Sequence, residues 1–203
     1  MFTGIIETTG RIQKADRSPT NLQLTIHAPK LGLHQIAIGD SIAVNGCCLT
    51  VVAKTPEAFM VDVSNESLAA TSGFSDGAEV NLEKSMRYGD RLGGHLVSGH
   101  VDGVGTVSAL DDLGASWRLV IDAPADLAKF VARKGSITVN GISLTVSTVK
   151  DLPNGRCTVA INIIPHTYQV TTIRGLHTGT RVNLEIDLLA RYLERMASVG
   201  SAT

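Results

Sequence analysis

Short runs of alternating hydrophobic and polar residues recur along most of the chain. In Leu22–Ile26 and Phe59–Val63 every second residue is large and apolar, whereas Ser41–Val44 and Leu49–Val52 are shorter and more continuously apolar. Runs of four to eight residues rich in β-branched side chains predict strands, and Gly, Asn, Asp or Pro separates these runs at short intervals. Many short strands with regular turns predict an all-β barrel or sandwich.

Two Asn-Gly pairs interrupt the apolar runs at corresponding places. Asn45-Gly46 and Asn140-Gly141 each stand between two predicted strands. This dipeptide favours the left-handed backbone of a two-residue hairpin turn. We therefore predict a tight β-hairpin at each pair.

The chain contains an internal repeat. Displacing the sequence by 95 positions superimposes its first half on its second half without a gap over a long stretch. Such self-similarity predicts two tandem copies of one domain, over residues 1–94 and 95–185. The matching pairs are Leu24–Pro29 with Leu119–Pro124, Ser41–Gly46 with Ser136–Gly141, Leu49–Val51 with Leu144–Val146 and, after a short insertion, Val80–Glu83 with Val182–Glu185.

The C-terminal residues 186–203 have a different pattern. Apolar residues recur at helical spacing from Ile186 to Ala197, which predicts an amphipathic helix. Asp187 is a candidate N-cap, and Arg191 and Arg195 stand towards the end that favours cations. The apolar side either contacts another subunit or packs on its own barrel, and the spacing does not decide between them.

Composition and charge narrow the function classes. The 18 Lys and Arg residues nearly balance the 19 Asp and Glu residues, which argues against nucleic acid and anionic membranes as partners. No apolar stretch approaches the roughly 20 residues of a membrane span, and the N-terminus lacks the pattern of a signal peptide, so we expect a cytoplasmic protein. Three cysteines, two of them adjacent, fit neither a disulfide framework nor a structural zinc site.

Several motifs resemble those of the riboflavin synthase family, and they cover essentially the whole chain in order. One departure lies in the first copy, where Asn65-Glu66-Ser67 stands in place of the Pro165-His166-Thr167 of the second copy. The motifs are Met1–Glu7, Asn45–Val51, GGHLVSGHVDG at 93–103, Lys134-Gly135-Ser136, Asn140–Val146, Ile164–Thr167 and Val182–Asp187.

The resemblance implies two six-stranded Greek-key β-barrels followed by a C-terminal helix that joins three chains into a homotrimer. It implies a transferase that needs no cofactor and no metal, and that dismutates two molecules of 6,7-dimethyl-8-ribityllumazine into riboflavin and a diaminouracil. Each active site would lie between the first barrel of one chain and the second barrel of another. Lumazine synthase is a candidate partner protein.

Positions at which the two copies differ are the candidates for assigning different roles to two identical substrates. Cys48 aligns with Ser143, Ile5 with His100, and Glu66 with His166, whereas Ser41 and Thr50 match Ser136 and Thr145. By the resemblance, the candidate catalytic residues are Cys48, His100, Ser143, Thr145 and Asp187.

Each of these residues also has a structural interpretation. Cys48 fits a buried core thiol as well as a ring contact, and His100 fits a structural histidine as well as a base for the methyl proton of the substrate. Ser143 and Thr145 share one strand face, which is turned either to solvent or to the pocket. Lys134 is either a surface lysine or a partner for negative charge on the ring.

The resemblance also implies the residues that bind substrate, and it places Phe2 and the segment around Gly4 in the wall of the first pocket. The implied set is Phe2, Thr3, Gly4, Ile5, Ile6, Ser41, Cys48, Leu49, Thr50, Asp62, Val63, Ser64, Asn65, Glu66, Ser67, Gly99, His100, Val101, Lys134, Ser143, Leu144, Thr145, Asn162, Ile163, Ile164, Pro165, His166 and Thr167.

Three rival functions remain. A non-catalytic lumazine- or flavin-binding protein would keep one pocket, but the motifs of both copies are intact here. A flavin-dependent oxidoreductase would need a strand, a GxGxxG loop and a helix, and no such unit occurs in the sequence. A purely structural repeat leaves the paired motifs unexplained.

Overall fold

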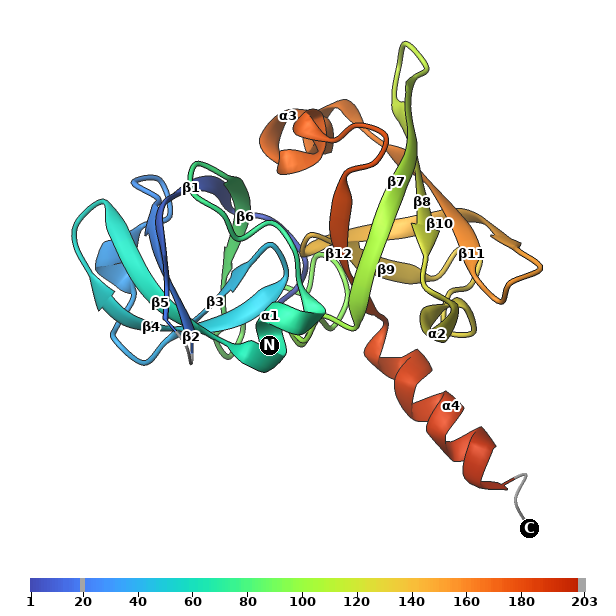
Figure 1. Ribbon diagram of the computed structural model, residues 1–203, viewed down its shortest axis with the longest axis horizontal. Coiled ribbons are helices and arrows are strands. Elements are labelled where there is room, and N and C mark those ends of the chain that lie inside the picture. The colour runs from blue at the N-terminus through green and yellow to red at the C-terminus, as the bar shows by residue number, and fades with distance from the viewer. Residues whose placement is uncertain (19–20, 201–203) are drawn as a thin grey trace.

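The computed structural model describes residues 1–18 and 21–200. Its strands form two closed antiparallel barrels that lie side by side, as Figure 1 shows. The first barrel contains β1 (Thr8–Arg17), β2 (Asn21–His27), β3 (Ser41–Val44), β4 (Cys47–Lys54), β5 (Ala58–Ser64) and β6 (Glu79–Lys84). The second contains β7 (Gly103–Asp112), β8 (Trp117–Ala123), β9 (Ser136–Val139), β10 (Ile142–Asp151), β11 (Cys157–Ile163) and β12 (Arg181–Ile186).

The two barrels have the same topology. Around the first barrel the strand order is β1-β2-β5-β4-β3-β6, and around the second it is β7-β8-β11-β10-β9-β12. In the first barrel β2 lies beside β5, and in the second β8 lies beside β11. Neither pair is consecutive in sequence, as is typical of a Greek key. The prediction of two six-stranded Greek-key barrels is therefore confirmed.

Period-two burial explains why these segments are strands. In β2 the side chains of Leu22, Leu24 and Ile26 point inward and are fully buried, while the residues between them are half-buried. Strand β8 repeats the pattern with Leu119 and Ile121. Each barrel closes around a separate apolar core, so each copy has its own hydrophobic stabilisation.

The predicted hairpins form, and they also hold the barrels together. Asn45 and Gly46 both have positive φ, of 46° and 81°, and they join β3 to β4. The same turn at Asn140 and Gly141 joins β9 to β10. A side chain at Gly46 would meet the Gly141 backbone at 2.7 Å, so the two turns touch at the interface between the barrels.

Two buried asparagines link these turns across the interface. Asn81 Nδ2 donates to Asn140 O, and Asn183 Nδ2 donates to Asn45 O, both at 3.0 Å. Each Asn45 and Asn140 side chain in turn accepts from the backbone of the asparagine in its own barrel, at 2.8 Å. The contact is therefore an almost two-fold symmetric set of buried hydrogen bonds.

Short helices connect some of the strands. The helices α1 (Asn65–Ala70) and α3 (Pro165–Val170) follow β5 and β11, and Ser64 Oγ caps α1 by accepting from Ser67 N at 3.1 Å. The remaining short elements are η1 (Leu33–Gln35), α2 (Ala125–Ala128) and η2 (Thr172–Gly175).

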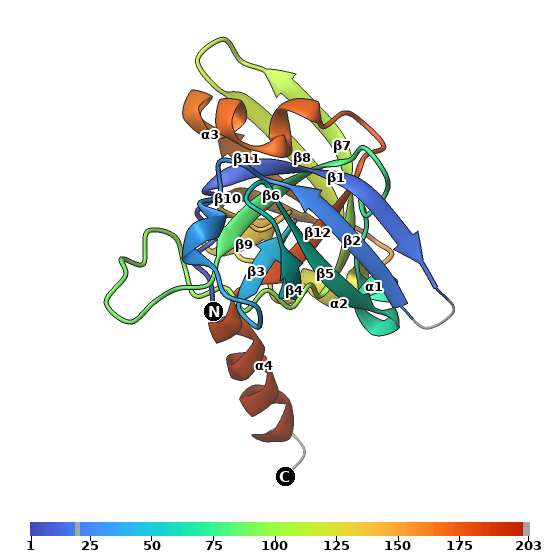
Figure 2. The same ribbon diagram turned by 90° about the vertical axis from the view of Figure 1, so that its left-hand side faces the viewer.

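The C-terminal helix α4 (Leu188–Gly200) projects away from both barrels, as Figures 1 and 2 show. Asp187 caps it as predicted, because its Oδ1 accepts from Leu189 N at 2.9 Å. The prediction that the helix begins at Ile186 is wrong. Ile186 pairs with Ile137 at the end of β12 and is buried, since the barrel core needs its side chain.

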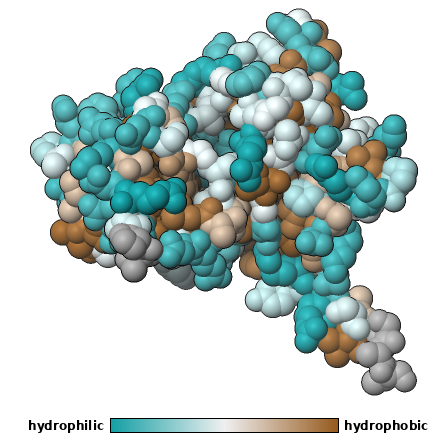
Figure 3. Space-filling view, in the orientation of Figure 1, coloured by the Kyte–Doolittle hydropathy of each residue, from teal (hydrophilic) through white to brown (hydrophobic). Residues whose placement is uncertain are grey.

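Several apolar side chains of α4 are exposed to solvent. Leu189, Leu193 and Met196 are 64%, 67% and 73% exposed, and hydrophobic side chains are visible on the protruding helix in Figure 3. Of the two interpretations, packing of the apolar side of α4 on its own barrel is wrong. Among residues 1–18 and 21–200, no helix is long and apolar enough to span a membrane.

Candidate functional site

The segments that precede the two barrels cross each other at the interface. Phe2 pairs with Val97 as an antiparallel bridge, with N···O distances of 2.8 and 3.1 Å. Beyond this crossing, Gly4 O accepts from Ser143 N at 2.8 Å, and Gly99 O accepts from Cys48 N at 2.7 Å. Each segment thus adds to the edge of the barrel formed by the other copy.

Side-chain packing follows the same exchange. Ile6 packs against the core of the second barrel, and Val101 packs against the core of the first. The segment predicted to wall the first pocket is therefore divided: Phe2 packs with Ala43 and Cys48 of the first barrel, whereas Gly4 and Ile6 lie against the second barrel. Sequence order suggested the first barrel for the whole segment, but the carbonyl of Gly4 finds its partner on β10.

Two buried glutamates hold the crossing segments in place. Glu83 accepts from Thr3 N and Thr3 Oγ1 at 2.7 Å and from Gly4 N at 3.0 Å. Glu185 accepts in the same way from Ser98 N, Ser98 Oγ and Gly99 N at 2.7, 2.6 and 3.0 Å. Burial raises the pKa of both carboxyl groups, and these hydrogen bonds oppose the rise.

The first site is a hollow of about 430 Å³ where β4, α1 and the exchanged segment meet. This volume lies within the range of small-molecule pockets, roughly 300–1,000 Å³. Cys48 contributes a half-buried thiol, and His100 an exposed imidazole. The lining residues are Cys47, Cys48, Glu66, Ser67, Ala70, Thr71, Gly99, His100 and Val101.

The second site is built from the corresponding parts of the other copy. Ser143 stands in the place of Cys48, beside Gly4, and α3 carries His166 and Thr167 in the places of Glu66 and Ser67. Ser143 and Thr145 share the outer face of β10, as predicted, and the Thr145 side chain is exposed. Trp117 of β8 stacks on Tyr168 of α3, with the ring centroids 3.8 Å apart.

A histidine from the junction between the copies completes the second site. His95 is only 8% exposed, and its Nδ1 lies 2.7 Å from Ser143 Oγ. Burial lowers the pKa of His95, although the nearby Asp187 carboxylate raises it. Asp187 therefore caps α4 and also acts electrostatically on His95.

The two-fold arrangement agrees with comparisons to known proteins. The model of the lumazine binding domain matches residues 3–85 and 98–187, so each match begins in a crossing segment. The riboflavin synthase of Photobacterium leiognathi is 41% identical over 98% of this chain and 90% of its own length. That of Mycobacterium bovis is 43% identical over 98% of this chain and its full length. This chain belongs to the riboflavin synthase family.

Solved structures of a related protein show the same fold. The structure of LumP complexed with riboflavin superimposes with a TM-score of 0.81 at 27% identity and covers 92% of this chain and 99% of its own. LumP complexed with 6,7-dimethyl-8-(1'-D-ribityl) lumazine gives a TM-score of 0.79 at 26% identity, with the same shares of both chains.

Several residues predicted from the riboflavin synthase motifs have buried side chains. Leu49, Val63, Leu144 and Ile163 face the barrel cores, and Phe2 is fully buried at the crossing of the segments. They alternate with outward-facing residues because strand side chains have a period of two.

The other predicted binding residues lie on the outer faces of the barrels or at helix starts. Ser41 pairs with Thr50 on the first barrel, and Lys134 is exposed in a left-handed conformation with φ of 68°. Asp62 accepts from Gln23 Nε2, and Asn162 from Ser116 Oγ, both at 2.9 Å. Exposed residues before or within the first turn of α1 and α3 are Ser64, Asn65, Glu66, Ile164, Pro165 and His166.

The three free cysteines of this family member differ in environment. Cys47 and Cys157 are buried, and burial raises the pKa of Cys47 to about 11. Cys48 is half-buried and lines the first site, so the interpretation of Cys48 as a core thiol is wrong. The strand alternation turns Cys48 outward while Cys47 and Leu49 point into the barrel.

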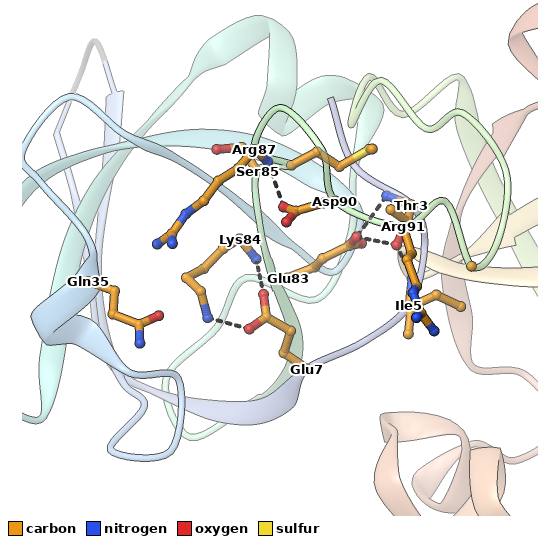
Figure 4. A pocket seen from close by; sticks show the side chains of 12 residues that line it. Thr3, Ile5, Glu7, Gln35, Glu83, Lys84, Ser85, Arg87, Asp90 and Arg91 are labelled. Atoms are coloured by element: carbon orange, nitrogen blue, oxygen red, sulfur yellow. Dashed lines mark hydrogen bonds and ion pairs between the residues drawn. The ribbon is translucent and has the colours of Figure 1, made fainter.

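A larger hollow of about 530 Å³ lies beside the N-terminal segment, as Figure 4 shows. Many of its polar groups are already paired. The Lys84 ammonium bonds the Glu7 carboxylate, Arg87 N donates to Asp90 at 2.7 Å, and Glu83 points to Thr3. Apart from the crossing segment, it shares no residue with the sites predicted from the motifs.

Reasoning from the sequence missed four residues that shape the sites. Glu83 and Glu185 occupy matching positions in the repeat, and that identity was a usable signal. Ser98 follows the same symmetry as the counterpart of Thr3. His95 stands in the motif GGHLVSGHVDG, but only the fold brings it to Ser143, 48 positions later in the chain.

Proposed function

We propose that this chain catalyses the dismutation of two molecules of 6,7-dimethyl-8-ribityllumazine. A four-carbon unit passes from one molecule to the other and yields riboflavin and 5-amino-6-(D-ribitylamino)uracil. The observation that carries this proposal is the presence of two sites with one design and different polar side chains. Both sites use a strand after an Asn-Gly turn, a short helix and a crossing segment.

Two sites of one design suit this reaction because both substrates are the same molecule. Holding two rings in a reactive arrangement replaces a bimolecular encounter by a unimolecular step, which contributes about 7–11 kcal/mol to rate enhancement. The differing residues give the two rings different surroundings. Cys48, Glu66 and His100 belong to the first site, and Ser143 and His166 to the second.

The arrangement of the sites favours a reaction between chains. Figures 1 and 2 both place α1 and α3 on opposite sides of the molecule, so the two sites of one chain do not face each other. Two rings therefore meet only if the first site of one chain faces the second site of another. A homotrimer joined by the exposed apolar side of α4 would provide this arrangement, and burying that side is favourable.

The chemistry begins with removal of a proton from the C7 methyl group of one lumazine. In our proposal His100, at the mouth of the first site, is the candidate base, because an imidazole nitrogen can accept a proton. Cys48 contacts the ring in that site, and Ser143 and Thr145 contact the ring in the second. Lys134 stabilises negative charge on the deprotonated ring. A cytoplasmic location and an association with lumazine synthase stay predictions.

The deciding experiment is to incubate the purified chain with 6,7-dimethyl-8-ribityllumazine alone and to follow both compounds by absorbance. We expect one riboflavin for every two lumazines consumed, without an added cofactor. Tight binding without turnover would refute the proposal and would indicate a non-catalytic lumazine-binding protein instead.

A further inference from the structure

The second site contains a pair of side chains that the first site lacks. His95 Nδ1 and Ser143 Oγ are 2.7 Å apart, the usual length of a good hydrogen bond. In the first copy Cys48 stands in the place of Ser143, and within residues 1–18 and 21–200 no hydrogen bond joins its thiol to a histidine. The two-fold symmetry of the sites is therefore broken at this point.

The surroundings of His95 fix its position. The backbone of Gly94 lies so close to the crossing segment that a side chain there would meet Thr3 O at 2.1 Å and Ser143 Oγ at 2.9 Å. His95 N donates to Thr3 O at 3.1 Å. The backbone at His95 is therefore held against the N-terminal segment, and the ring is held by its contact with the Ser143 hydroxyl.

The other ring nitrogen indicates which atom carries the proton. His95 Nε2 is buried and has no hydrogen-bond partner in the described part of the chain. A neutral imidazole protonated at Nε2 would leave an N–H group buried without an acceptor, an arrangement that folded proteins rarely tolerate. Protonation at Nδ1 avoids that cost and makes Nδ1 the donor to Ser143 Oγ. Burial also favours the neutral ring, since it lowers the pKa of His95.

We propose that His95 is a positioning residue for the second site. Its Nδ1–H donates to Ser143 Oγ, so that the hydroxyl proton of Ser143 is directed away from His95 and is free to be donated to a bound pteridine ring. No proton leaves His95 in this role. The inference rests on the proposed function for the identity of the ligand, and it distinguishes the second site as the one with a pre-oriented hydroxyl donor.

Matched substitutions test the donor role. In His95→Asn the side-chain amide nitrogen can take the place of Nδ1 and donate to Ser143. In His95→Gln the amide nitrogen lies at the former place of Nε2, further from Ser143. His95→Leu has about the size of Asn but has no hydrogen-bond donor. We expect kcat to fall about tenfold in His95→Leu and His95→Gln, and to stay within about threefold in His95→Asn. His34→Asn, at an exposed histidine of η1, is the control and should leave kcat unchanged.

A double-mutant cycle separates positioning from a merely structural effect. If His95 acts through the hydroxyl, His95→Leu has no further effect on kcat in the Ser143→Ala background. An equal loss in both backgrounds would overturn the proposal, and so would a loss in His95→Asn as large as in His95→Leu. Thermal unfolding identifies any variant that fails to fold, and the Asn and Gln pair then decides the question alone.

A titration that needs no turnover distinguishes failure of this inference from failure of the proposed function. Trp117 is the only tryptophan of the chain and stacks on Tyr168 of α3, so its emission can follow the binding of riboflavin. We expect His95→Leu to weaken riboflavin binding several-fold, by about the factor of one lost hydrogen bond, and only when Ser143 is present. If the unsubstituted chain forms no riboflavin, the proposed function fails, and this titration still supports or overturns the role of His95.

Discussion

The contact between the two Asn-Gly turns makes a quantitative prediction. Gly46 has φ of +81°, and an added side chain would lie 2.7 Å from Gly141 N, a backbone atom that cannot move without its barrel. Gly77 has nearly the same φ, +78°, but nothing lies within 4 Å of an added side chain there. The pair Gly46→Ala and Gly77→Ala therefore separates the strain of a left-handed backbone from the cost of the contact.

The expected magnitudes follow from these two terms. A left-handed conformation costs an alanine about 1–2 kcal/mol, and this is the whole expected loss for Gly77→Ala. Gly46→Ala adds an overpacking cost of about 1–3 kcal/mol. It also threatens the bond from Asn183 Nδ2 to Asn45 O, one of the hydrogen bonds that cross the interface. We expect a total loss of about 2–5 kcal/mol in the free energy of unfolding.

Urea unfolding followed by circular dichroism, with a common slope for both variants, measures this difference. Gly141→Ala should reproduce the result of Gly46→Ala, because its added side chain would lie 2.8 Å from Gly46 N. Equal losses for Gly46→Ala and Gly77→Ala would refute the reasoning, since the barrels would then not be in contact at the turns.

Three further predictions concern thiols, a buried carboxyl group and the terminal helix. Iodoacetamide at pH 8 should modify Cys48 well before Cys47, because burial raises the pKa of Cys47 to about 11. A bound lumazine should protect Cys48 from modification. Mass spectrometry of the digested protein measures both effects, and a faster reaction of Cys47 would contradict the prediction. Burial raises the pKa of Glu185, so the stability that this group contributes is complete below the unfolded value of 4.5 and is lost as the pH rises through the folded value. The stability difference between the unsubstituted chain and Glu185→Gln should therefore shrink as the pH rises from 4.5, and urea unfolding that shows a growing difference would exclude this cause. Leu193→Asp should dissociate the proposed oligomer and abolish turnover. Leu113→Asp, at another exposed leucine in the β7–β8 hairpin, is the control and should have neither effect. Sedimentation velocity measures dissociation, and an unchanged sedimentation coefficient for Leu193→Asp would disprove the role of α4.

Much of the fold could be predicted because its signals are local. The alternation in Leu22–Ile26 specifies a strand with one buried face, and Asn45-Gly46 specifies the hairpin that follows β3. Duplication of these signals in the second half determined that there are two copies, but the pattern left open whether each is a barrel or a sandwich. Period-two alternation also gave the shared outer face of Ser143 and Thr145.

The sites depended on contacts that no local pattern contains. The hydrogen bond between Gly4 and Ser143 decided that Gly4 adds to the second barrel and not to the first. The space in the barrel core decided that Ile186 ends a strand and does not begin a helix. His95 gained its role from a neighbour 48 positions away, and Asn183 bonds Asn45 across 138 positions. The sequence alone determined the elements and their duplication, because strand alternation and turn chemistry act between near neighbours. Only the tertiary structure decided the exchange of the crossing segments, because buried polar groups take whichever partner the packed barrels bring within reach.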